Sequence, residues 1–130
     1  MDWSNADYES FKPNMTTEQA MEWFTAKLAR TPEAVDIYQF GKGFFELGAY
    51  SRAQCCLQAY LTLPHPSPQA RHLLGYCYLN LNEQERALRE FKLCVKEGFH
   101  EDWQLVVELL VEIAEMKQQE VIRDRHVDQF

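Results

Sequence analysis

Apolar side chains recur along this chain every three or four positions, the spacing that places them on one side of an α-helix. The first stripe follows a capping box formed by Thr16 and Gln19, and the residue before Pro32 avoids helical geometry. A helix over 17–30 is therefore expected. Later stripes predict helices over 33–47, 50–62, 68–81, 84–97 and 102–121. The pattern predicts an all-α chain.

Residue types recur at an interval of 34 positions through the middle of the chain. The positions expected to form the helix contacts are Gly41, Phe44, Ala53, Leu57, Gly75, Tyr78, Ala87 and Phe91. Small residues let two helix backbones approach closely, and Gly48 and Asn82 stand where each hairpin is expected to turn. The alternative, an ordinary helix bundle, requires no such recurrence. The interval is that of the tetratricopeptide repeat (TPR), a pair of antiparallel helices that stacks into a solenoid.

The pattern divides the chain into three parts. Residues 1–14 are polar with isolated aromatic residues and are expected to form a flexible arm, 15–122 a TPR-like domain, and 123–130 a charged tail that frays. After Gly98 the register fails, because Leu109 stands where a small residue is expected. The last segment is therefore either a single closing helix or the first helix of an irregular third repeat. The expected fold is an antiparallel helix-pair solenoid of two repeats, flanked by an N-terminal helix and a long C-terminal helix.

The composition favours a binding module over an enzyme. The four cysteines lack Cys-x-x-Cys spacing and the four histidines share no ligand spacing with them, so we expect buried reduced thiols, no metal and no cofactor. No catalytic motif is present. The net charge of −7 argues against nucleic acid, although Arg71 and His72 form a local basic pair. No apolar run is long enough for a membrane span, and no secretory signal is expected.

A binding groove is expected along the first helix of each pair, about 100° around that helix from the face that packs on its partner. The residues that this geometry assigns to the groove are Tyr38, Lys42, Phe45, Gln69, His72, Tyr76, Leu79, Trp103, Val106 and Leu110. Aromatic side chains with a few polar ones are typical of a groove for a peptide or helix. The alternative is that the helix at 17–30 or the N-terminal arm covers these rings. We further expect self-association through the apolar C-terminal helix.

The repeats resemble those of TPR proteins, which are scaffolds and adaptors. Some TPR co-chaperones hold a C-terminal carboxylate with lysines and asparagines. Here Tyr38 stands where such a clamp has lysine and Tyr76 where it has asparagine, which argues against that activity.

Residues 38–115, and above all the stretches 40–60 and 70–95, resemble the N-terminal helical domain of the large Ran-binding nucleoporin of the nuclear pore's cytoplasmic filaments. The resemblance implies a non-catalytic module that anchors a nucleoporin to the pore through other nucleoporins, on the cytoplasmic side. The alternatives are a cytosolic TPR adaptor or co-chaperone, located in the cytoplasm, and a self-assembling structural module.

Overall fold

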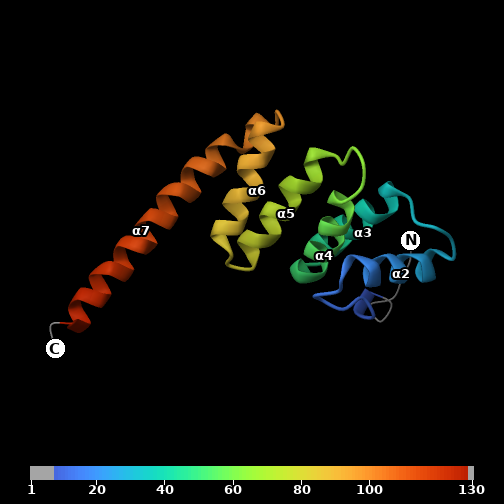
Figure 1. The fold of residues 1–130 in the computed structure, drawn as a ribbon, viewed down its shortest axis with the longest axis horizontal. Helices are drawn as coiled ribbons and strands as arrows, with labels where there is room; N and C mark the ends of the chain where they lie inside the picture. Colours follow the sequence, from blue (N-terminus) through green and yellow to red (C-terminus); the bar gives the residue numbers. More distant parts are fainter. Residues whose placement is uncertain (1–7, 129–130) are drawn as a thin grey trace.

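The computed structural model describes residues 8–128 (Figure 1). This part of the chain contains helices and no strand, which confirms the all-α prediction. The elements in chain order are α2 (Thr17–Leu28), α3 (Ala34–Glu46), α4 (Tyr50–Leu61), α5 (Pro68–Asn80), α6 (Gln84–Lys96), the short 3-10 helix η1 (His100–Asp102) and α7 (Trp103–Asp128). Each observed boundary up to α6 lies within two residues of the one that the apolar pattern predicts.

The helices stack in the order of the sequence, as a solenoid does. Helix α3 packs against α4 and α5 against α6, and the two pairs join through α4 and α5. Helix α2 lies against α4 at one end of the stack, and α7 lies against α6 at the other (Figure 1). The TPR-like architecture is therefore confirmed.

A glycine in each pair marks the closest approach between its two helices. A Cβ built on Gly41 would lie 2.9 Å from Leu57 Cδ2, and one built on Gly75 would lie 2.6 Å from Phe91 Cε1. The sequence paired Gly75 with Ala87; the atoms nearest to the Gly75 Cβ position belong to the ring of Phe91, on the same helix as Ala87, α6. This ring leaves no room for a side chain at Gly75 unless it moves.

The turns of the two hairpins use left-handed residues where the sequence placed them. Gly48 has φ 76° and Asn82 has φ 59°. Glycine adopts this conformation without strain, and asparagine tolerates it better than most residues. The expected capping box also begins α2, with Gln19 N donating to Thr16 Oγ1 at 3.1 Å.

The described part of the N-terminal segment packs against the domain. Phe11 is completely buried; its ring lies 5.2 Å from that of Phe44 and 5.0 Å from that of Trp23. Arg52 Nε donates to the carbonyl of Phe11, which ties the segment to α4. In the structure, residues 8–14 of the expected flexible arm over 1–14 lie against the first repeat, whose exposed end needs an apolar cover. Residues 1–7 lie outside the described residues.

Helix α7 is a single closing helix and is longer than expected. It continues through Asp128, so residues 123–128, which the charge pattern assigned to a fraying tail, are helical in the structure; 129 and 130 lie outside the described residues. Leu109 is buried against the stack, whereas Met116 is 44% exposed. The second half of α7 diverges from α6 and projects from the stack (Figure 1).

The cysteines Cys55, Cys56, Cys77 and Cys94 are buried and unpaired, as expected. Burial raises the pKa of the Cys77 and Cys94 thiols to about 12. Within residues 8–128 no three His, Cys, Asp or Glu side chains are placed to hold a metal ion together. Nor is any helix of that part long and apolar enough to cross a membrane.

Candidate functional site

The candidate groove residues on α3 lie on one side of that helix. Tyr38 is half-buried and its ring packs 5.5 Å from that of Tyr60, so burial raises the pKa of its hydroxyl. Lys42 is exposed. Phe45 packs edge-on against Tyr50 at 5.6 Å. These two aromatic side chains contact α4 and still present part of their surface to solvent.

The candidate residues on α5 form a closer group. His72 and Tyr76 are in edge contact at 4.9 Å, and both rings pack on Phe91 of α6. Gln69 is exposed at the first turn of the helix, and Leu79 is half-buried at the last. Within the described residues, the ring contacts of the N-terminal segment and α2 with α3 are made to Phe40 and Phe44.

The residues expected from the last helix do not join this group. Val106 is only 3% exposed and lies in the core, while Trp103 and Leu110 are exposed outside the pocket. The side chains that α7 presents toward α5 are instead Gln104, Leu105 and Glu108. The broken 34-residue register had left the rotation of α7 about its axis undetermined.

A buried contact between Asp102 and His72 lies where α7 begins. Asp102, the last residue of η1, is completely buried; its Oδ2 is hydrogen-bonded to His72 Nδ1 at 2.9 Å, whereas its Oδ1, 2.7 Å from the same nitrogen, has no hydrogen-bond partner. A carboxylate can be buried only where donors compensate for the water it has lost. The burial of the Asp102 carboxylate therefore requires the imidazole of His72 on α5. This contact lies immediately before the first residue of α7. Sequence reasoning took Asp102 for a first-turn acid favoured by the helix dipole and missed this role.

Between α5 and the start of α7 lies an open pocket of about 420 Å³. Its lining consists of two aromatic rings, three carboxylates and two neighbouring side chains of α7: His72, Tyr76, Glu101, Asp102, Glu108, Gln104 and Leu105. Two of these seven residues, His72 and Tyr76, were candidates from the sequence, and Asp102 is the direct partner of His72.

The pocket carries negative charge. Burial, and then the charges of Asp102 and Glu108, raise the pKa of the Tyr76 hydroxyl. The basic pair expected at Arg71 and His72 does not form a cationic patch: Arg71 lies 3.0 Å from Glu90 and 3.5 Å from Glu97, and His72 faces Asp102. An aromatic ring beside carboxylates suits a cationic side chain, through the ring face and through charge.

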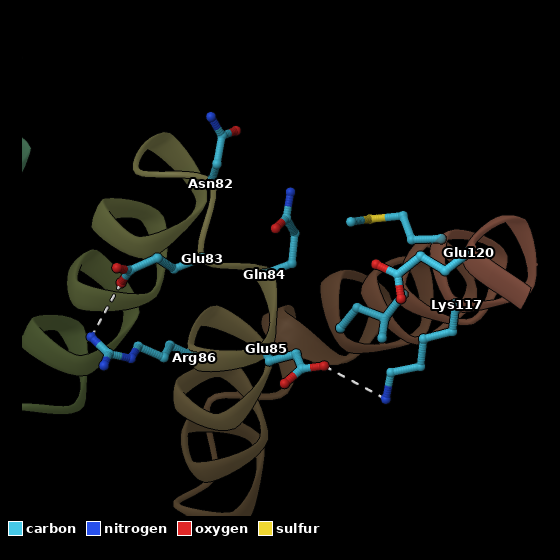
Figure 2. A pocket seen from close by; sticks show the side chains of 9 residues that line it. Asn82, Glu83, Gln84, Glu85, Arg86, Lys117 and Glu120 are labelled. Carbon is cyan, nitrogen blue, oxygen red and sulfur yellow. Dashed lines mark hydrogen bonds and ion pairs between the residues drawn. The ribbon is translucent and has the colours of Figure 1, made fainter. Parts of the chain in front are cut away.

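A second cavity, of about 380 Å³, opens between the first turn of α6 and the second half of α7. Figure 2 shows Glu85 and Lys117 reaching toward each other across it, at 3.6 Å. Arg86 turns away to Glu83, at 3.4 Å. Both ion pairs are largely exposed to solvent and so contribute little to the stability of the fold. This cavity exists because α7 diverges from α6, and it brings together no group with a distinctive chemistry.

Comparison with protein families agrees with the fold. No curated protein matches the chain. A family model described as anaphase-promoting complex, cyclosome, subunit 3 matches residues 14–93, the part that runs from the capping box of α2 into α6. The match covers α2 to α5 and most of α6, which is more than half of the chain. The chain therefore belongs to the anaphase-promoting complex, cyclosome, subunit 3 family of TPR-like helical repeats.

Proposed function

We propose that this chain is a non-catalytic protein-interaction module whose pocket between α5 and α7 receives a basic side chain of a partner peptide. TPR-like repeats are protein-binding modules, and the family match supports this broad role. The observation that carries the finer proposal is the pocket itself, where Tyr76 lies beside Glu101, Asp102 and Glu108. The net charge of −7 also favours a basic partner segment.

A single lysine or arginine of the partner is the expected anchor. Its apolar stem would lie along Leu105 and its charged end between Tyr76 and Glu108, all of which line the pocket. The exposed parts of Tyr38, Lys42 and Phe45 would contact the rest of an extended peptide. Aromatic anchors in such interfaces carry about 2 kcal/mol or more each.

The proposal is tested by selecting peptides from a random display library against the whole chain. Selected peptides should share a lysine or arginine, and replacing Tyr76 and Tyr38 with alanine should weaken their binding more than tenfold with helical circular dichroism retained. Glu108→Gln should weaken binding, and Glu115→Gln, the same change at an exposed residue outside the pocket, should not. Selected peptides without a basic residue, or indifferent to Tyr76 and Glu108, would overturn it.

The nuclear-pore role implied by the resemblance of residues 38–115 stays a hypothesis about the partner. The family match supports a TPR-like module and names no nucleoporin. A fluorescent fusion of the chain should collect at the nuclear rim if other nucleoporins are its partners. A diffuse cytoplasmic signal favours the adaptor alternative, with or without a chaperone partner.

Self-association is a second candidate function, favoured by the exposed apolar side chains of α7. Leu110 and Val111 are 45% and 53% exposed on a helix that no other described element covers on that side. A face of this kind normally marks an interface. Sedimentation equilibrium of the whole chain at about 100 μM should reveal a dimer, and Leu110→Glu or Val111→Glu should reduce it.

A further inference from the structure

His72 lies among the carboxylates of the pocket between α5 and α7. Its Nδ1 is hydrogen-bonded to the Asp102 carboxylate at 2.9 Å, and its ring is in edge contact with that of Tyr76 at 4.9 Å. The side chain is 26% exposed and lines the pocket together with Glu101 and Glu108. Histidine is the residue type that gains a proton between about pH 8 and pH 5. The pocket therefore contains a side chain whose charge changes near neutral pH.

The hydrogen bond to Asp102 determines which nitrogen of the ring takes up that proton. An ionised carboxylate only accepts hydrogen bonds, so His72 Nδ1 donates to Asp102 Oδ2 and the second proton is bound at Nε2. Nδ1 is a donor in both protonation states, so the buried carboxylate keeps the hydrogen bond that its burial requires. Protonation of His72 therefore changes the charge of the pocket and leaves the junction of α5 and α7 in place.

The elements α5, α6, η1 and α7 place other charged or titratable groups around His72. These are Arg71, Tyr76, Glu90, Cys94, Glu97, Glu101, Asp102 and Glu108. Burial raises the pKa of the Cys94 thiol to about 12 and also raises that of the Tyr76 hydroxyl, so both groups stay protonated and neutral near pH 7. In peptides, carboxylates titrate near about pH 4 and guanidinium groups above about pH 12. His72 is thus the residue of this set whose type titrates near neutral pH.

We infer that protonation of His72 weakens the binding of a basic partner side chain in this pocket, so that the partner binds at neutral pH and dissociates on acidification; the inference rests on the proposed function. A lysine or arginine of the partner keeps its positive charge throughout this range. When His72 gains a proton, the pocket loses one unit of negative charge. The imidazolium then repels the partner's cation.

The contact between His72 and Tyr76 strengthens this effect. The two rings meet edge to face, with 77° between their planes. A cation beside an aromatic ring is attracted by the ring's electrons, so an imidazolium at this place competes with the partner's cation for the Tyr76 ring. The two effects have the same sign, and both weaken binding as the pH falls.

Measuring peptide affinity at two pH values tests the inference. The probe is an N-acetylated peptide from the display selection that contains one lysine or arginine and no histidine or carboxylate side chain. At constant ionic strength the whole chain should bind it about threefold or more weakly at pH 5.5 than at pH 7.5. His72→Asn retains a side-chain nitrogen that can donate to Asp102 but cannot gain a proton, so its affinity should be the same at both pH values. Circular dichroism at each pH confirms that the variant is folded.

His100→Asn is the matched control. His100 is an exposed histidine of η1 that does not line the pocket, so this variant should retain the pH dependence of the parent. A pH dependence that persists in His72→Asn, or disappears in His100→Asn, would assign it to another group and overturn the inference.

Nuclear magnetic resonance provides a second readout on the unsubstituted chain, which does not depend on the folding of a variant. The coupling between proton and peptide is reciprocal, so saturating peptide at pH 6.5 should reduce the protonated fraction of His72, measured from the carbon shifts of its labelled imidazole. Peptide binding that is equal at both pH values and leaves His72 protonation unchanged would overturn the inference, while the basic-peptide pocket would stand. A selection that yields no basic peptide would overturn the proposed function and this inference with it.

Discussion

His72 and Asp102 join α5 to the start of α7 across a gap of 30 residues in sequence, with 2.7 Å between Nδ1 and Oδ1. The carboxylate is completely buried and the imidazole side chain is 26% exposed. This contact holds the closing helix at a defined rotation and places Glu108 beside Tyr76. It is therefore part of the scaffold and of the candidate site.

Replacing His72 with alanine should lower the free energy of unfolding by about 2–3 kcal/mol, because it leaves the Asp102 carboxylate buried without its donor. Urea denaturation followed by circular dichroism measures the loss. Gln69→Ala, at an exposed position of the same helix, serves as the control and should change stability by less than about 0.5 kcal/mol. Equal stability of the two variants would show that the pair is not structural.

Gly75 and Gly43 should respond to substitution in opposite directions. Gly75→Val should destabilise the chain by about 2–4 kcal/mol, because its Cβ would lie 2.6 Å from the Phe91 ring. Gly43 is also within a helix, but nothing lies within 4 Å of its Cβ position. Gly43→Ala should therefore stabilise by about 0.5–1 kcal/mol. Thermal or urea unfolding of both variants tests the register of the repeat, which would be wrong if Gly75→Val cost less than about 0.5 kcal/mol.

Phe11→Ala should cost about 3–4 kcal/mol, the usual loss for a fully buried aromatic side chain. Lys12→Ala, the exposed neighbour, should be nearly neutral. The comparison decides whether the N-terminal segment belongs to the folded domain. A Phe11→Ala chain as stable as the parent would mean that the segment is the flexible arm that the sequence had indicated.

Stability should fall as the pH rises above about 9, in part through Cys77. Burial raises its pKa to about 12 in the folded chain from an ordinary value of 9.0, so the unfolded thiol loses its proton first. The unfolded state then binds fewer protons than the native state, and the free energy of unfolding decreases by about 1.4 kcal/mol per pH unit per thiol. The stability that the protonated Cys77 thiol contributes is fully present below pH 9 and is lost as the pH rises toward 12. Urea denaturation at pH 8 and pH 10 should show a smaller decrease for Cys77→Ala than for the parent.

The amino-acid sequence by itself determined the helices, their pairing and the family of the fold. The interval of 34 residues placed Gly41 and Gly75 at the helix contacts, and left-handed Gly48 and Asn82 at the turns, because these features depend on local spacing and backbone conformation. His72 and Tyr76 could be assigned to one side of α5 for the same reason. The spacing of residues along the chain was sufficient to predict the structure wherever the repeat was regular.

Only the tertiary structure decided what lies at the two ends of the stack. Phe11 looked like an isolated aromatic residue in a polar segment, yet its burial depends on rings of α2 and α3 that lie 12 or more residues away in sequence. The rotation of α7 depends on the contact between His72 and Asp102, which no periodicity encodes. Because that rotation buries Val106 and turns Glu108 toward Tyr76, the acidic character of the pocket became visible only once the helices were packed together.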